Sequence, residues 1–93
     1  MKLKLTRVNR PDVVSYACTV SVMHHGEPRA TEVCAYWDDC SGGKPGWAYS
    51  FSHTSRGGPL EDPGEKPISK LAGPRRLARA LLKCLEWEGL TLI

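Results

Sequence analysis

Three cationic side chains in the C-terminal third of the chain recur at intervals of four residues. They are Arg75, Arg79 and Lys83, and this spacing places them along one face of an α-helix. The guanidinium group of arginine binds phosphate and carboxylate groups through paired hydrogen bonds. Arg76 broadens the group, and Trp87 lies at its edge, where a large aromatic side chain can anchor an interface. The five residues therefore predict a partner-binding surface suited to phosphate or carboxylate groups.

A simpler interpretation of these residues stays open. Surface helices commonly carry charges that contact only water, and Glu86 and Glu88 could partly neutralise the cations. Trp87 could equally close the edge of a core, as large aromatic residues often do. Against this, Arg75 and Arg76 fall in the predicted first helical turn, where the helix dipole disfavours cations. That unfavourable placement indicates a use for the two arginines.

The helix that must carry these residues is predicted over 73–89. Gly73 is an acceptable N-cap, Pro74 suits the first helical position, and Gly89 suits a left-handed C-terminal cap. At 100° per residue, the arc opposite the cations is apolar and should attach the helix to a sheet. Its members are Leu77, Ala78, Leu81, Leu82, Cys84 and Leu85.

Four β-strands are predicted before the helix, over residues 2–8, 13–23, 29–37 and 47–54. Polar and apolar side chains alternate in them, which is the period-2 pattern of a half-buried strand. The clearest run, VVSYACTVSVM, places five apolar side chains on one face, so that this face should meet the core. Those side chains are Val14, Tyr16, Cys18, Val20 and Val22.

Glycine, proline and polar residues mark the connections between these strands. Residues 24–28 read as a hairpin turn, and a turn centred on Gly26 would place Cys18 opposite Cys34. Residues 55–69 contain three glycines and three prolines without periodicity, and we expect a long surface loop, mobile or ordered. Residues 90–93 are compatible with a short final strand. The predicted fold is a single α+β domain, 1–93, with an antiparallel four-stranded meander and one C-terminal amphipathic helix packed on one face.

Length, composition and charge narrow the class of protein. The chain has 93 residues, 41% hydrophobic and 25% charged, which suits one globular domain. A formal net charge of +3 is below that of a dedicated nucleic-acid-binding protein. No apolar run reaches the roughly 18 residues of a membrane span, and the N-terminal residues lack a signal-peptide pattern. We therefore expect a cytoplasmic protein without membrane contact, whose four cysteines are thiols.

Residues that could support catalysis or bind a metal lack the usual spacing. Cys34 and Cys40 do not form a zinc-type pair, and the three histidines show no ligand pattern. Phosphate-binding, dinucleotide-binding and hydrolase motifs are absent from the sequence. We expect no enzymatic activity, cofactor, metal or small-molecule substrate. The alternatives are a zinc- or thiol-dependent module, with Cys40 as the reactive thiol, and a pH-sensing role for His24 and His25.

Two resemblances bear on the partner. Strands followed by GPRRLARALLKCL resemble the C-terminal part of a double-stranded-RNA-binding domain, which implies phosphate contacts by Arg75, Arg76 and Arg79. The chain departs from that family by four predicted strands and by lacking its N-terminal helix. In size and plan the chain is also similar to small phage-encoded inhibitors, including some anti-CRISPR proteins. The shared features are a meander after Asn9-Arg10-Pro11 and one amphipathic helix ending in Glu86-Trp87-Glu88-Gly89.

Together these features predict a small non-enzymatic binding protein. Its most concrete version is a phage-type, anti-CRISPR-like inhibitor that docks on a host nucleic-acid-processing complex. The partner is then a protein or a protein–nucleic-acid complex, and the binding residues are Arg75, Arg76, Arg79, Lys83 and Trp87. Direct binding of nucleic acid by the same basic helix face is the alternative.

Overall fold

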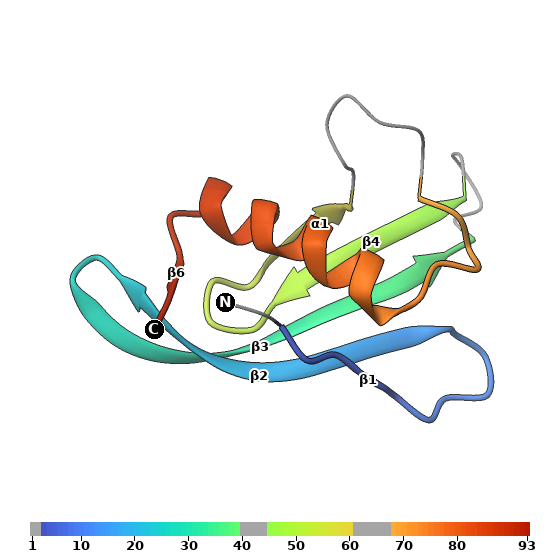
Figure 1. The fold of residues 1–93 in the computed structure, drawn as a ribbon, viewed down its shortest axis with the longest axis horizontal. Helices are drawn as coiled ribbons and strands as arrows, with labels where there is room; N and C mark the ends of the chain where they lie inside the picture. The colour runs from blue at the N-terminus through green and yellow to red at the C-terminus, as the bar shows by residue number, and fades with distance from the viewer. Residues whose placement is uncertain (1–2, 40–44, 61–67) are drawn as a thin grey trace.

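The computed structural model describes residues 3–39, 45–60 and 68–93. Within these residues the chain forms six β-strands and one α-helix (Figure 1). The elements are β1 (Thr6–Arg7), β2 (Ser15–His24), β3 (Glu27–Asp38), β4 (Gly46–Phe51), β5 (Arg56–Pro59), α1 (Pro74–Trp87) and β6 (Thr91–Leu92).

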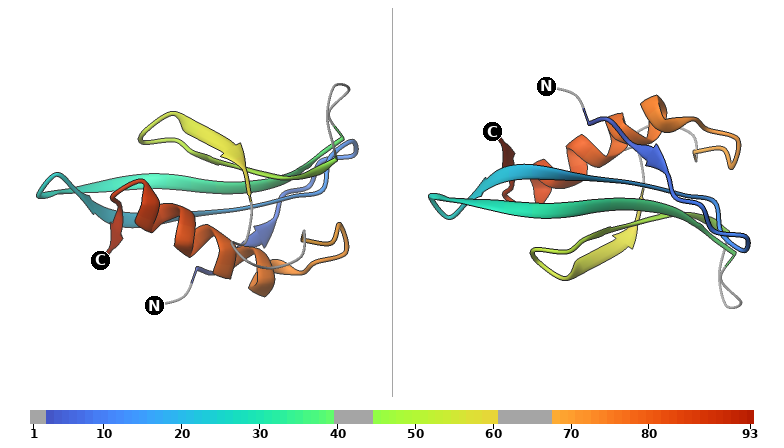
Figure 2. Two further views of the ribbon diagram at one scale, coloured as in Figure 1. Left: turned by 90° about the horizontal axis from the view of Figure 1, so that it is seen from above. Right: turned by 90° about the horizontal axis from the view of Figure 1, so that it is seen from below.

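The strands form one antiparallel sheet with α1 on one side. Strands β1 to β5 follow one another as a meander, and β6 pairs with β2 after the helix. The views of Figure 2 show α1 on one side of β2 and β3, and they show the sheet twisting so that the β4–β5 hairpin turns away from the helix. The predicted α+β class, with a meander and one C-terminal helix, is confirmed, as is the short final strand.

The predicted loop 55–69 is wrong for its first part. β4 ends at Phe51, residues 52–55 form a turn with Ser55 at a φ of 53°, and Arg56–Pro59 return as β5. The sequence RGGP concealed this strand because glycine has no side chain and so cannot display polar and apolar alternation. The sheet therefore has more strands than the four predicted. Residues 61–67 lie outside the described part of the chain.

Gly57 is required where β5 approaches β4. A Cβ atom added at Gly57 would lie 2.5 Å from the backbone oxygen of Tyr49, whereas one at Gly58 would meet only a Tyr49 ring carbon at 3.9 Å. We expect Gly57→Ala to lower the free energy of unfolding by about 1–2 kcal/mol, because the crowding outweighs the backbone entropy that alanine saves. Urea unfolding would measure this. Gly58→Ala is the matched control and should not lower the free energy of unfolding. Equal losses of unfolding free energy in both variants would contradict the predicted crowding.

The β2–β3 register also differs from the expectation by one residue. The hairpin closes through a two-residue turn, His25–Gly26, in which both residues have positive φ, at 52° and 79°. This is the turn type that matches the twist of two antiparallel strands. Cys18 therefore pairs with Val33, and Cys34 pairs with Ala17. Because one residue of slip moves a side chain to the other face, Cys18 and Cys34 lie on opposite faces, and their predicted pairing is wrong.

The core lies between α1 and the sheet face that carries Val22, Val33 and Phe51. Of the predicted apolar arc, five members are buried and Leu82 is half-buried, while Ala80 is buried although it was not predicted to be. The five are Leu77, Ala78, Leu81, Cys84 and Leu85. Leu3 and Leu5 are buried, although only Thr6–Arg7 of the predicted strand 2–8 pairs as β1.

Both ends of α1 follow the predicted capping residues. Gly73 is the N-cap in an extended conformation, and Pro74 opens the helix. At the other end Gly89 adopts a φ of 75°. The backbone amide of Gly89 donates to the backbone carbonyl oxygen of Glu86 at 3.0 Å. The backbone amide of Leu90 donates to the backbone carbonyl oxygen of Leu85 at 2.9 Å. This pair of bonds is the Schellman arrangement, which ends the helix and directs the chain into β6.

Candidate partner-binding surface

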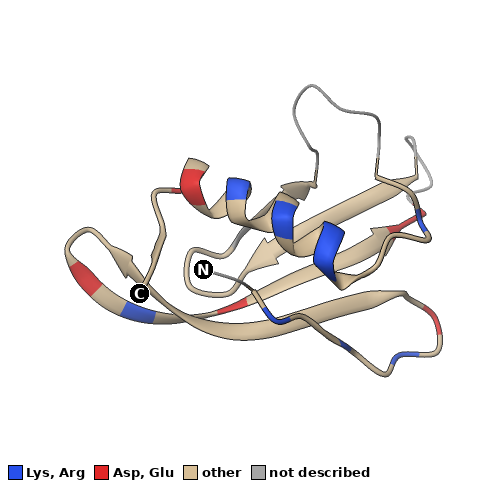
Figure 3. Ribbon diagram, in the orientation of Figure 1, with Lys and Arg blue, Asp and Glu red and all other residues tan. Residues whose placement is uncertain are grey.

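The exposed side of α1 carries the residues predicted to bind a partner. We call the set Arg75, Arg76, Arg79, Lys83 and Trp87 the α1 ridge. Arg75 and Arg79 are exposed, and Trp87 is 66% exposed. Basic residues occupy successive turns of the helix on the side facing the viewer in Figure 3. The prediction that this face points away from the core is therefore correct for these three residues.

The other two members of the α1 ridge differ in their surroundings. Arg76 and Lys83 are half-buried, and each already interacts with another group of the protein. In contrast, within the described residues, Arg75 and Arg79 form no ion pair or side-chain hydrogen bond. Arg75 and Arg79 are thus the cations best able to meet an external group.

The charged side chains of α1 are distributed unfavourably with respect to the helix dipole. Its first turn contains no acidic residue and its last turn no basic residue, while Arg75 and Arg76 stand at the N-terminal end. Glu86 and Glu88 stand near the C-terminal end. A cation near a helix N-terminus, or an anion near a C-terminus, typically costs about 0.3–1 kcal/mol at low ionic strength. An acidic partner bound over the first turns of α1 would make the electrostatic energy at Arg75 favourable instead of unfavourable.

Exposed apolar side chains lie near both ends of the α1 ridge. Trp87 ends the helix, and Leu71, in the turn before it, is 93% exposed. That turn is held by the Leu71 amide, which donates to the Ser69 hydroxyl at 3.1 Å. From Arg75 to Trp87 the helix rises by about 18 Å. Leu71 was not among the predicted binding residues, because a leucine in a loop without periodicity gives no signal of its exposure.

An apolar groove adjoins the C-terminal half of the α1 ridge. It lies between α1 and β6, has a volume of about 380 Å³, and is bordered by Lys83 and Glu86. Its apolar lining consists of Leu82, Leu85, Leu90 and Leu92. A groove with an apolar floor and charged borders is suited to an apolar side chain of a protein partner.

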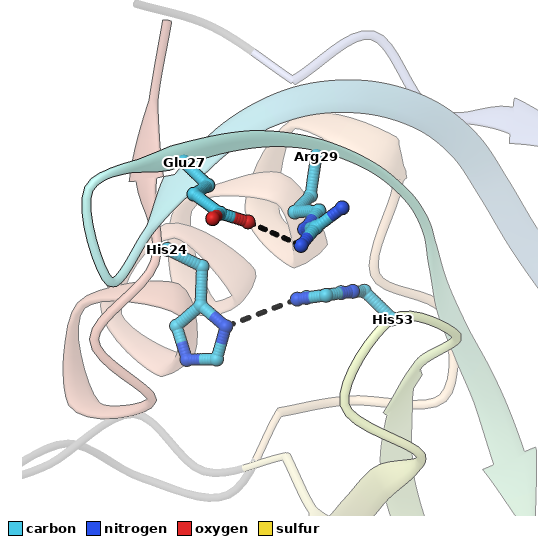
Figure 4. Close-up of polar contacts among 4 residues, drawn as sticks. All are labelled: His24, Glu27, Arg29 and His53. Carbon is cyan, nitrogen blue, oxygen red and sulfur yellow. Dashed lines mark hydrogen bonds and ion pairs between the residues drawn. The ribbon is translucent and has the colours of Figure 1, made fainter.

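The histidines are closer together than their sequence positions suggested. His24 Nδ1 lies 3.0 Å from His53 Nε2, and the two rings meet edge to face (Figure 4). The ring of His25 packs against that of His24, with centroids 4.0 Å apart. Partial burial lowers the pKa of His24, and the neighbouring His25, His53 and Arg29 lower it further. The sequence shows no ligand spacing among the histidines, and it gave no sign that His24 and His53 meet.

The described cysteines, Cys18, Cys34 and Cys84, are free thiols. Cys84 is 1% exposed, and burial together with the nearby Glu88 raises its pKa to about 11. Burial also raises the pKa of Cys18. Both shifts disfavour the reactive thiolate. Cys40, the candidate reactive thiol, lies outside the described residues.

Within the described residues, no group of three or more His, Cys, Asp and Glu side chains is arranged to hold a metal ion. No helix of the described part is long and apolar enough to cross a lipid bilayer. In comparisons with protein-family models, curated proteins and solved structures, no match to this chain was found.

Proposed function

We propose that this protein is a non-enzymatic binding protein that docks the α1 ridge on an acidic surface of a protein or protein–nucleic-acid complex. The observation that carries the proposal is the pair Arg75 and Arg79, exposed and without ion pairs in the described residues, with exposed Trp87 on the same helix. Arginine and tryptophan are the residues most enriched among those that dominate binding energy.

The energetics of the helix favour an acidic partner. Arg75 stands where the helix dipole opposes a positive charge, so that a carboxylate contacting its guanidinium group relieves an existing repulsion. Paired hydrogen bonds between guanidinium and carboxylate add geometric specificity. The free protein therefore carries a small electrostatic cost that binding would remove.

The apolar groove between α1 and β6 favours a protein over bare nucleic acid. A phosphate backbone has no apolar side chain to place between Leu82 and Leu92, whereas a protein surface does. Exposed Trp87 and Leu71 add apolar contact area. In this proposal the cations orient the partner, and the apolar groups contribute most of the affinity.

The most concrete version of the proposal is a phage-type inhibitor, of the anti-CRISPR kind, that blocks a host nucleic-acid-processing complex. Its support is the resemblance in size and plan and the basic surface. A small basic protein docked on such a complex would occupy a functional surface and exclude the normal ligand.

Charge reversal on the α1 ridge tests the proposal. Purified wild-type protein and the Arg75→Glu/Arg79→Glu variant would be used as bait, and the affinity for each captured complex measured with purified components. We expect affinity to fall at least tenfold in the variant, because contacts between paired charges become repulsions. The control is Arg7→Glu/Arg10→Glu, which gives the same net charge from exposed positions in β1 and in the loop after it. Retention of every interaction by the α1 variant would show that the ridge is only a solvated face.

The same variants distinguish docking on a protein from direct binding of nucleic acid. A gel shift with duplex RNA and DNA at low salt should show no specific retardation if the partner is a protein. Retardation by the wild type that is lost in Arg75→Glu/Arg79→Glu, and that weakens steeply with salt, would replace the proposal by direct nucleic-acid binding.

A further inference from the structure

Three histidines gather at one end of the sheet, on elements other than α1. His24 is the last residue of β2, His25 lies in the β2–β3 turn, and His53 lies in the turn between β4 and β5. Strand β3 lies between β2 and β4, so the two turns meet across it. Figure 4 shows the His24 and His53 rings pointing toward each other, from the end of β2 and from the β4–β5 turn.

The backbone positions of both histidines are held by hydrogen bonds. The His53 amide donates to the Thr31 hydroxyl at 3.1 Å, and Thr31 is 1% exposed. The preceding residue, Ser52, makes two hydrogen bonds with the backbone of Glu32. The Ser52 hydroxyl accepts from the Glu32 amide, and the Ser52 amide donates to the Glu32 carbonyl oxygen. His24 is fixed by its pairing with Glu27 at the end of the hairpin. The pair of rings is thus presented by a preorganised backbone.

The distance between the two ring nitrogens matches coordination of one metal ion. With metal–nitrogen bonds of about 2.0–2.1 Å, two nitrogens 3.0 Å apart subtend an angle of about 94° at the metal. That value is close to the cis angle of a square-planar site, which Cu²⁺ and Ni²⁺ favour, and is narrower than the tetrahedral angle preferred by structural Zn²⁺. Imidazole is a good ligand for these ions, and Cu²⁺ binds tightest in the divalent series.

We propose that His24 Nδ1 and His53 Nε2 bind a single late divalent transition-metal ion, with Cu²⁺ bound most tightly. The metal takes the place of the hydrogen bond between the rings, and both rings turn about their side-chain bonds so that their lone pairs converge on a point beside the line joining the two nitrogens. The ring that donated this bond moves its proton, through solvent, to its other nitrogen, so that both facing nitrogens offer a lone pair. Water completes the coordination, since no third protein ligand converges there within the described residues.

The neighbouring side chains have other roles in this site. Glu27 forms an ion pair with Arg29, so its carboxylate already has a partner. The ring of His25 packs on His24 and supports it without being a ligand. This distinction gives a matched control, because His25→Gln removes an imidazole from the same cluster and leaves both proposed ligands in place.

The experiment is a titration of the full chain with CuSO₄, and separately with NiCl₂, in a buffer that does not coordinate metals. Calorimetry should show one equivalent of Cu²⁺ bound, and electron paramagnetic resonance should show coupling to two nitrogens. We expect His24→Gln and His53→Gln each to weaken Cu²⁺ binding at least tenfold, while His25→Gln binds as the wild type does. Bound metal should also raise the Tm of the wild type by several degrees.

Three outcomes would overturn the site. They are the absence of one-equivalent Cu²⁺ binding, unchanged binding in the His24→Gln/His53→Gln double variant, and an equal loss in His25→Gln. Far-ultraviolet circular dichroism would confirm that each variant folds. The Arg75→Glu/Arg79→Glu variant should bind Cu²⁺ as the wild type does. The proposed metal site and the proposed partner surface are therefore tested independently of each other.

Discussion

Replacing Trp47 by alanine should lower the free energy of unfolding by about 3–5 kcal/mol. The Trp47 side chain is buried between the sheet and the segment leading to α1. Its indole N–H donates to the backbone carbonyl oxygen of Ser69 at 2.8 Å, and its ring contacts the rings of Tyr16 and Trp37. Truncation would leave a large cavity and remove the hydrogen-bond donor of a partly buried carbonyl group. Urea unfolding followed by circular dichroism gives the measurement.

Trp87→Ala is the matched control for this change. Trp87 is 66% exposed and so should lose little on truncation, within about 0.5 kcal/mol of the wild type. The same variant should weaken partner binding, because we assign Trp87 to the α1 ridge. A large loss of stability in Trp87→Ala would mean that this residue belongs to the core, and that its assignment to the partner surface is wrong.

Leu81→Ala should cost about 2–5 kcal/mol of unfolding free energy. Leu81 is fully buried, on the face of α1 that packs against the sheet. Its removal subtracts apolar contacts and leaves a void that the rigid sheet cannot fill. Leu71→Ala makes the same chemical change at a 93% exposed position and should leave stability unchanged. Equal losses in the two leucine variants would mean that α1 does not pack as described.

Most of the fold follows from periodicity that can be read in the chain. The alternation around Val20 and Val22 predicted β2, and the spacing of Leu77, Leu81 and Leu85 predicted the buried side of α1. These patterns succeed because each element must bury one face, and the same buried face determines which residues alternate. The exposed side of α1 was predictable for the same reason.

The errors arise where side chains carry no pattern or where turn geometry decides. β5 was missed because Gly57 and Gly58 have no side chains to alternate. The register of β2 and β3 was wrong by one residue because the turn was predicted over 24–28, centred on Gly26, whereas it consists of the two residues His25 and Gly26. A non-glycine residue with positive φ is hard to anticipate from residue type alone.

The meeting of His24 and His53 depends on both of these missed features. The exact hairpin register sets the position of His24, and the early end of β4 places His53 in a turn rather than within a strand. Neither residue is near the other in sequence, and neither has a ligand-type spacing. A pair of this kind can be found only once the register of the sheet is known.

Strands β1 and β6 pair with the same edge of β2, at its two ends. Little of that edge is left to hydrogen-bond another chain. At the opposite edge, β5 has only four residues and ends in Pro59, which lacks an amide hydrogen. Within the described residues, the sheet is therefore poorly suited to recruiting a foreign strand or stacking into fibrils, and recognition must pass through side chains.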